Sequence, residues 1–276
     1  MKSEPFLLED VSYFTIPQWK MLNKDLVVGF TTKNDGSSSG QFQSLNVGLH
    51  VNDDKKTVVE NRETVARKLS IPLSKWICAE QVHDNRIERV TSKQIGSGAS
   101  NYQTSIPQTD GLYTNESNIL LSLFFADCVP IFFFSPKHHM VGLVHAGWKG
   151  TVKNITGIFL KKWTKIEGIL PNDIYVAIGP SIRACCYKVD CKVIKEVDKL
   201  FSTNSSKYYQ QIEEEQYLLN LQKINKDICL LHGVPRENIV ESLYCTSCQT
   251  NYFFSHRRDK GKTGRMMSFI GFKEVI

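Results

Sequence analysis

The sequence predicts an α+β fold in which helices cover mixed sheets, built as a single domain over residues 1–276. Short runs rich in β-branched and aromatic residues, bounded by Pro and Gly, indicate buried strands. Longer segments with apolar residues three or four positions apart predict amphipathic helices. The two patterns are interspersed without a regular strand–helix–strand alternation, internal repeats or a linker, and this arrangement favours one α+β domain.

The N-terminal third contains two predicted strands with a helix between them. Leu26–Thr32 and Trp76–His83 are apolar runs of strand length, and the second ends at a histidine. Asp53 and Asp54 precede Lys55–Leu69, whose apolar positions share one face. Acidic residues at this position accept hydrogen bonds from free N–H groups and suit the helix dipole, so Lys55–Leu69 is predicted to be a capped helix.

The central stretch Ile119–Thr151 is the most apolar part of the chain. Its predicted strands are Ile119–Ala126, Ile131–Ser135 and Met140–Val144. The first is followed by Asp127 and Cys128, and the third by His145. A cysteine and a histidine at the ends of neighbouring buried strands can meet in space, so they are a candidate reactive or metal-binding pair.

The C-terminal half contains further helices and strands around a polar segment, Ser202–Glu215, that is expected at the surface. The predicted helices are Gly150–Ile166, Val189–Phe201 and Tyr217–His232. Gly233 and Pro235 are a stop signal for the last of these. The predicted strands are Ile174–Ile178, Ile239–Tyr244 and Ser268–Phe272.

Composition narrows the class of protein. With 41% apolar residues, 22% charged residues and a net charge of +6, the chain is ordinary globular protein. Its longest apolar block, Ile119–Phe134, is too short to span a bilayer and contains Asp127 and Pro130. We expect a cytoplasmic protein that binds neither membrane nor nucleic acid. Its eight dispersed cysteines are expected to be free thiols, one of them catalytic or metal-bound.

Three residues at the ends of apolar runs carry the main chemical prediction: His83, Cys128 and His145. Taken singly, each has a simpler explanation as a packed or hydrogen-bonded core residue. Together they offer imidazole and thiolate, the ligands that zinc prefers. Three protein ligands with one open position are typical of catalytic zinc.

Other constellations are weaker. Cys245-x-x-Cys248 has zinc-knuckle or redox spacing, and the adjacent Cys185 and Cys186 could contribute to it. Because there is no second CxxC pair, a four-cysteine zinc site is not expected, and the role of these cysteines stays open. The basic segment His256–Arg265 is either an anion site or a solvated face. The HExxH, Walker, GxGxxG and GxSxG motifs are absent.

Several longer segments together resemble one known family. They are TTKNDGSSSGQFQSLNVGLHVNDD, VVENR, EQVH, TDGLYT, ADCVP, HAGWKGT, AIGPSIRACCYKV and YCTSCQTNYFFSHRRD followed by GR. With these segments the chain resembles the YfiH/YlmD-like family, also named the DUF152, laccase-domain or peptidoglycan-editing-factor family, over about residues 29–272. Departures at Lys33–Asp35, Asp84 and His256 leave the His83, Cys128 and His145 set intact.

The resemblance implies a four-layer α/β/β/α fold, similar to that of YfiH-like cysteine hydrolases, and a zinc (or copper) ion on His83, Cys128 and His145. It also implies a purine nucleoside enzyme. Such an enzyme cleaves adenosine, guanosine, inosine and methylthioadenosine with phosphate, releasing the base and ribose 1-phosphate, and deaminates adenosine to inosine. Within matching segments, Arg62, Lys149 and Arg258 are expected to bind phosphate or substrate. Asp127 is a candidate for proton transfer.

Three alternatives remain. The first is a metal-free Cys128–His145 hydrolase acting on amide bonds of cell-wall peptides. The second is a copper polyphenol oxidase, which is disfavoured because none of the seven histidines forms an HxH motif. The third is a non-enzymatic partner in cell division or envelope assembly. The preferred nucleoside, the physiological role and the oligomeric state are not predicted.

Overall fold

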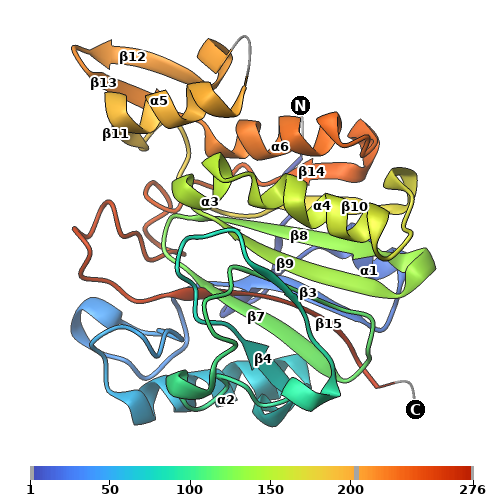
Figure 1. Ribbon diagram of the computed structural model, residues 1–276. Helices are drawn as coiled ribbons and strands as arrows, with labels where there is room; N and C mark the ends of the chain where they lie inside the picture. The colour runs from blue at the N-terminus through green and yellow to red at the C-terminus, as the bar shows by residue number, and fades with distance from the viewer. Residues whose placement is uncertain (1–2, 202–204, 275–276) are drawn as a thin grey trace.

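The computed structural model describes residues 3–201 and 205–274 and has four layers, helix, sheet, sheet and helix (Figure 1). One sheet contains β1 (Leu7–Asp10), β2 (Tyr13–Thr15), β3 (Leu26–Thr31), β15 (Met266–Phe272), β7 (Ile119–Phe125) and β4 (Trp76–Cys78), in this order. The other contains β14 (Ile239–Glu241), β10 (Tyr175–Ile178), β8 (Val129–Ser135), β9 (Met140–Ala146), β6 (Gly111–Thr114) and β5 (Ile87–Arg89). Both sheets are mixed, as predicted.

Helices cover the outer faces of the two sheets. They are α2 (Lys55–Leu69), α3 (Trp148–Val152), α4 (Ile155–Lys165) and α6 (Leu221–Leu231). Helix α1 (Pro17–Leu22) lies instead beside the sheets, where its Trp19 packs into the core between them. In Figure 1, α3, α4 and α6 lie over the sheet that contains β8 and β9, and α2 lies beneath the sheet that contains β7. A smaller unit of β11 (Lys188–Asp190), α5 (Cys191–Leu200), β12 (Tyr209–Glu213) and β13 (Gln216–Leu219) projects from one corner. The layers confirm the predicted α/β/β/α fold.

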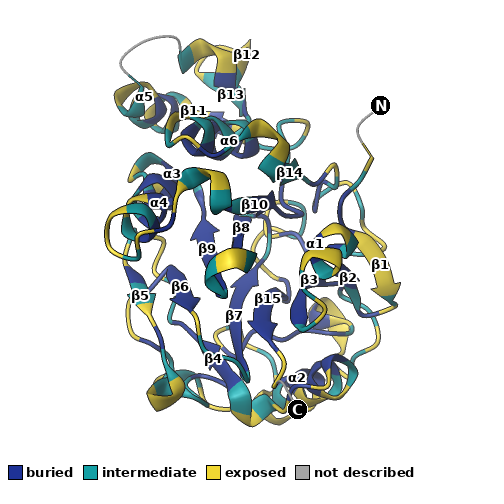
Figure 2. Ribbon diagram, turned by 90° about the vertical axis from the view of Figure 1, so that its right-hand side faces the viewer, coloured by how far each residue is buried: buried dark blue, intermediate teal, exposed yellow. Residues whose placement is uncertain are grey.

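Consecutive residues of β8 belong to different layers of the core. Phe132 and Phe134 pack between the two sheets, in one core cluster with apolar residues of β3 and β7. Phe133 points to the other face and stacks on Phe159 of α4, with ring centroids 4.0 Å apart. Because side chains alternate across a strand, a strand covered on both faces is continuously apolar. This explains the run of phenylalanines and the dark, buried strands of Figure 2.

Three sequence predictions agree with the structure almost to the residue. Helix α2 begins and ends where the sequence predicted, and the carboxylate of Asp54 accepts a hydrogen bond from the N–H of Thr57. The predicted strands at β3 and β7 are also confirmed, each one residue shorter at its end. Among the described residues, no helix is both long and apolar enough to cross a membrane.

Several predicted elements are wrong in extent; the strand predicted at Ile239–Tyr244, for example, ends at Glu241. The strand predicted at Trp76–His83 ends at Cys78. The single helix predicted at Gly150–Ile166 is split at Asn154, whose φ of 58° interrupts α3 and whose side chain caps α4. Helices α5 and α6 begin later than predicted, after Asp190 and Asn220, because those side chains cap them.

The residues that precede these two caps form strands instead of helix. Lys188–Asp190 and Gln216–Leu219 pair with each other as β11 and β13. Part of the polar segment expected at the surface, Tyr209–Glu213, adds the third strand, and its outer side chains are exposed. Residues 202–204 of that segment lie outside the described residues. Pairing between strands that are distant in sequence therefore overrides the helical periodicity of the residues that form β11 and β13.

Candidate active site

Cys128 lies in the short turn between β7 and β8. The turn is possible because Asp127 adopts a φ of 87°. In this conformation its carboxylate contacts a loop that follows β14 and is distant in sequence. That carboxylate accepts hydrogen bonds from the Thr246 hydroxyl (2.6 Å), the Ser255 hydroxyl (3.0 Å) and the Arg257 N–H (2.6 Å). Both oxygens of Asp127 are thus engaged in holding the loop, whereas the Cys128 thiol is left free to face a cavity.

His145 reaches the same place from β9. Strands β8 and β9 are antiparallel, and His145 pairs with Pro130, two residues beyond Cys128. The imidazole is buried, and its Nδ1 lies 2.7 Å from Oδ1 of Asp110. With Nδ1 engaged, Nε2 remains available toward Cys128, which is the arrangement found for histidines that bind metal through one nitrogen.

Asp110 also fixes the loop that carries His83. Its fully buried carboxylate accepts from the backbone N–H groups of Val82 (3.1 Å), His83 (3.0 Å) and Asp84 (2.9 Å). His83 has a φ of 61°, a left-handed conformation that a non-glycine residue adopts at a cost. One carboxylate, at the start of β6, therefore orients both histidines.

The three predicted residues do meet. Their ligand atoms all lie within 4.8 Å of one another, and His83 Nε2 is 3.9 Å from Cys128 Sγ. In a tetrahedral zinc site, bond lengths of about 2.3 Å to sulfur and 2.0 Å to nitrogen place such atoms roughly 3.5 Å apart. The donor set and spacing thus fit a metal ion with three protein ligands.

Opposite charges stabilise each other in this cluster. Burial raises the pKa of the Cys128 thiol, but His145 and His83 outweigh that effect and lower it to about 6. Burial lowers the pKa of His145, whereas the charge of Cys128 and the bond to Asp110 raise it. Without a metal, the pair therefore favours thiolate and imidazolium at neutral pH.

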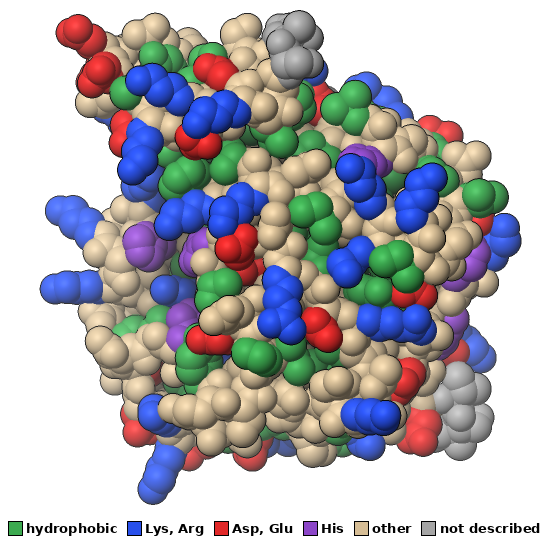
Figure 3. Space-filling model, viewed as in Figure 1, with side chains coloured by type: hydrophobic (Ala, Val, Ile, Leu, Met, Phe, Trp, Pro, Cys, Tyr) green, Lys and Arg blue, Asp and Glu red, His purple; other side chains and the backbone are tan. Residues whose placement is uncertain are grey.

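The cluster opens into a cavity of about 470 Å³, within the usual range for small-molecule sites. Its walls combine aromatic with basic and imidazole side chains, among them Tyr102, Phe124, Trp148, Tyr187, Lys149, Arg257, Arg265, His50 and His256. In the view of Figure 3, histidine and basic side chains gather at the left edge, beneath the projecting α5 unit. The cavity can therefore take a flat apolar group together with an anion.

Of the three expected phosphate-binding residues, only Lys149 lines this cavity. The buried Arg62 donates to the carbonyl oxygens of Val47, Gly98 and Ala99, and its guanidinium lies over the Phe124 ring. Arg258 donates to the Asp259 carboxylate and to backbone carbonyls. Both guanidinium groups bind other groups of the protein and so stabilise loops. We therefore do not assign Arg62 and Arg258 to the candidate site.

Sequence reasoning missed Asp110 and Tyr187 as site residues. Asp110 belongs to the segment TDGLYT, but it lies 27 residues from His83 and 35 residues from His145 in sequence, so no local pattern links it to either histidine. Tyr187 follows an adjacent pair of cysteines and carries no recognisable signal of its own. Its position depends on how the projecting unit packs, which the sequence does not reveal.

Comparison with known proteins gives consistent matches along almost the whole chain. Residues 27–273 match a family model described as multi-copper polyphenol oxidoreductase laccase. Purine nucleoside phosphorylase YlmD of Bacillus subtilis (strain 168) is 48% identical over 274 residues, 98% of each chain. The crystal structure of YlmD from Geobacillus stearothermophilus is 45% identical, with a TM-score of 0.95 over 99% of this chain and 100% of that one. Neisseria meningitidis protein NMB0706, of family DUF152, is 26% identical with a TM-score of 0.77 over 91% and 95%.

Proposed function

The chain belongs to the YlmD/YfiH-like, or DUF152, family whose model is described as multi-copper polyphenol oxidoreductase laccase, and from this membership we propose that it is a purine nucleoside phosphorylase. The observation that carries the proposal is the His83, Cys128 and His145 cluster at the wall of a cavity that also holds basic and aromatic side chains. A purine nucleoside has a flat base, and its co-substrate phosphate is an anion. The aromatic side chains can therefore bind the base, and the basic side chains can bind phosphate.

We propose that His83, Cys128 and His145 would hold zinc, because one thiolate and two imidazoles at a cavity wall are the ligand set of a catalytic zinc site. Zinc held there would supply a Lewis acid that polarises an oxygen. Asp110 keeps Nδ1 of His145 engaged, so Nε2 faces the cluster. A copper electron-transfer site has the same two imidazoles and one thiolate but adds a methionine, and no methionine of the described residues lines this cavity, which favours zinc.

The proposed reaction transfers the ribosyl group from the base to phosphate. A phosphate oxygen attacks C1′ of the ribose, the bond from C1′ to the base nitrogen breaks, and the base leaves with the electron pair and gains a proton. The protein binds the base against Trp148 and Tyr187 and binds phosphate through Lys149 and Arg257. The same open site would serve deamination of adenosine, in which water attacks C6 and ammonia leaves.

Product analysis tests the proposal. Purified protein is incubated with adenosine, guanosine, inosine or methylthioadenosine, with and without phosphate, and the products are separated by chromatography. Base and sugar 1-phosphate formed only with phosphate support phosphorolysis, and inosine formed from adenosine without phosphate supports deamination. Absence of all these products from metal-loaded protein would overturn the assignment.

Lys149→Ala is expected to raise the KM for phosphate about tenfold while leaving the KM for the nucleoside nearly unchanged. One charge-assisted hydrogen bond is worth about 1.5 kcal/mol at an exposed position, which corresponds to about a tenfold change. The matched control is Lys153→Ala, because Lys153 is close in sequence but pairs with Asp84 outside the cavity lining. Equal effects of the two variants, measured by steady-state kinetics, would contradict a phosphate role for Lys149.

A second candidate function is a cysteine hydrolase, favoured by the chain of contacts from Asp110 through His145 to Cys128. A thiol activated by an oriented imidazole is the arrangement of cysteine nucleophiles. The two functions differ in their response to metal. Chelation abolishes the activity of a zinc-dependent phosphorylase, whereas it leaves a cysteine hydrolase active.

In metal-stripped protein, alkylation of Cys128 by iodoacetamide is expected to be half-maximal near pH 6, compared with about 8.5 for an ordinary thiol. Below that pH the thiol is protonated and unreactive, and above it the thiolate reacts. Adding zinc should suppress the reaction because the thiolate becomes a ligand. Mass spectrometry of the Cys128 peptide across pH measures both effects, and an unshifted profile would remove the argument for an activated nucleophile.

A further inference from the structure

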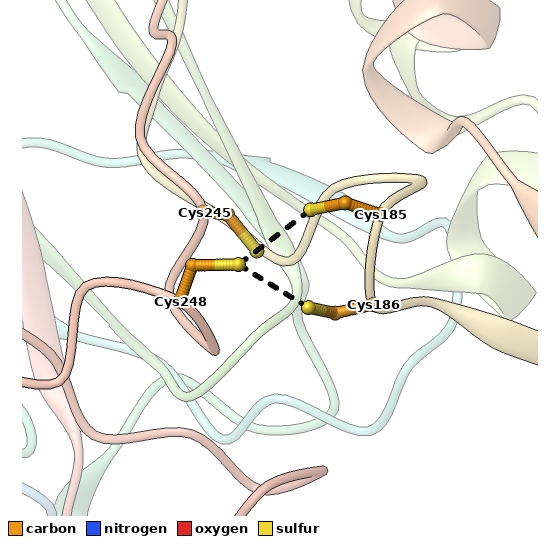
Figure 4. Close-up of side chains that lie close together, drawn as sticks. All are labelled: Cys185, Cys186, Cys245 and Cys248. Carbon is orange, nitrogen blue, oxygen red and sulfur yellow. Dashed lines mark hydrogen bonds between the residues drawn. The ribbon is translucent and has the colours of Figure 1, made fainter.

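Four cysteines that the proposed function does not use converge at a second place in the molecule. They are Cys185, Cys186, Cys245 and Cys248, and their sulfur atoms all lie within 4.8 Å of one another. Sγ of Cys248 is 3.3 Å from that of Cys186 and 3.7 Å from that of Cys185. Figure 4 shows all four side chains turned toward one common point, two from each of two loops.

Backbone contacts hold the two loops in register. Cys185 and Cys186 lie between β10 and β11, and Cys245 and Cys248 follow β14. Ser181 forms a parallel β-bridge with Cys245, and the N–H of Thr246 donates to the Ser181 carbonyl. The N–H of Arg183 lies 3.4 Å from Sγ of Cys245, a donor placed to stabilise a thiolate. The cysteines thus meet because of the fold and not through side-chain contacts alone.

We propose that these four cysteines bind a structural zinc ion. Four thiolates in tetrahedral arrangement, with no position left open, are the composition of a structural site. A disulfide does not account for the cluster, because a bonded pair has its sulfur atoms about 2.0 Å apart and leaves two thiols unused. The sequence-based expectation against a four-cysteine site looked for a second CxxC, whereas the second pair is two adjacent cysteines.

The ion would fasten the projecting unit to the wall of the active-site cavity. Cys186 directly precedes Tyr187, which lines the cavity, and the chain then enters β11 of the projecting unit. The guanidinium of Arg257, also in the cavity wall, lies 5.2 Å from the centre of the Tyr187 ring and donates to the Lys188 carbonyl. Zinc at the cysteines therefore fixes the position of two cavity residues without contacting substrate.

Metal content separates this site from the one at Cys128. Wild-type protein is expected to contain two zinc ions per chain, Cys128→Ala one, and the double variant Cys185→Ser/Cys248→Ser one. Both cysteines of the double variant are exposed, so their replacement leaves the core intact. Cys191→Ser is the matched control, because Cys191 lies close in sequence but outside the cluster, and this variant should keep both ions.

Cobalt substitution gives a readout that needs no change in the cluster. In the Cys128→Ala background, a cobalt ion bound by four thiolates should give strong sulfur-to-cobalt charge-transfer absorption, and bound zinc should raise the midpoint of thermal unfolding. One zinc per wild-type chain that disappears with Cys128→Ala, or a Cys128→Ala protein without cobalt–thiolate absorption, would overturn the proposal. So would six free thiols instead of eight in unreduced, unfolded protein, because that count indicates a disulfide. None of these measurements depends on nucleoside turnover.

Discussion

Protein carrying Cys128→Ala is expected to lose the metal of the catalytic cluster and about a thousandfold of its phosphorolysis rate. Cys128 supplies the only thiolate among the three ligands, and its sulfur is placed by the turn that Asp127 holds. A catalytic metal contributes several kcal/mol of transition-state stabilisation, and each 1.36 kcal/mol is a factor of ten. His145→Ala should have a similar effect because it removes the buried imidazole that we propose as a ligand of the same ion.

Metal content and nucleoside turnover are measured on the same samples. Cys78→Ala is a poor control because Cys78 is fully packed in the core, whereas the half-buried Cys191 tests the general effect of losing a cysteine. Unchanged metal and rate in Cys191→Ala, together with loss of one metal ion and of the rate in Cys128→Ala, match the expectation. A Cys128→Ala protein that loses metal but keeps its rate would show that the reaction takes place elsewhere.

The sequence predicted the centre of the fold better than its edges. The strands β7, β8 and β9 are covered on both faces, so each is a continuous apolar run that local composition reveals. Edge strands such as β1 and β12 are mostly exposed, and their sequences contain no such run. Strand β13 pairs with β11 on one side and β12 on the other. Only this pairing distinguishes its residues from the start of α6.

The same difference explains the outcome at the site. Cys128 and His145 stand next to buried runs, and antiparallel pairing of β8 with β9 brings them together within two positions. His83 was predicted to end a strand, but it lies in a loop whose shape is set by Asp110, a residue with no distinctive local pattern. The two arginines that were expected to bind phosphate donate to backbone carbonyls and, for Arg258, to the Asp259 carboxylate, and only three-dimensional contacts reveal this.

Replacing the buried carboxylate in Asp110→Asn is expected to lower both the stability of the fold and the affinity for metal. One oxygen accepts from the His83 N–H and from Nδ1 of His145, and the other from the N–H groups of Val82 and Asp84. An amide NH₂ in place of either oxygen faces two donors and can accept from neither. We expect a loss of about 1–3 kcal/mol in the free energy of unfolding.

Metal affinity should fall about 10–100-fold in the same variant, because the carboxylate orients one ligand and holds the loop of another. Asp84→Asn is the matched control: Asp84 is adjacent to His83, but its carboxylate is exposed and pairs with Lys153 at the surface. Zinc titration of metal-stripped protein and urea unfolding measure the two quantities. If Asp110→Asn binds zinc as tightly as Asp84→Asn, the histidines are oriented by the strand and loop backbone alone, and the carboxylate has only a structural role.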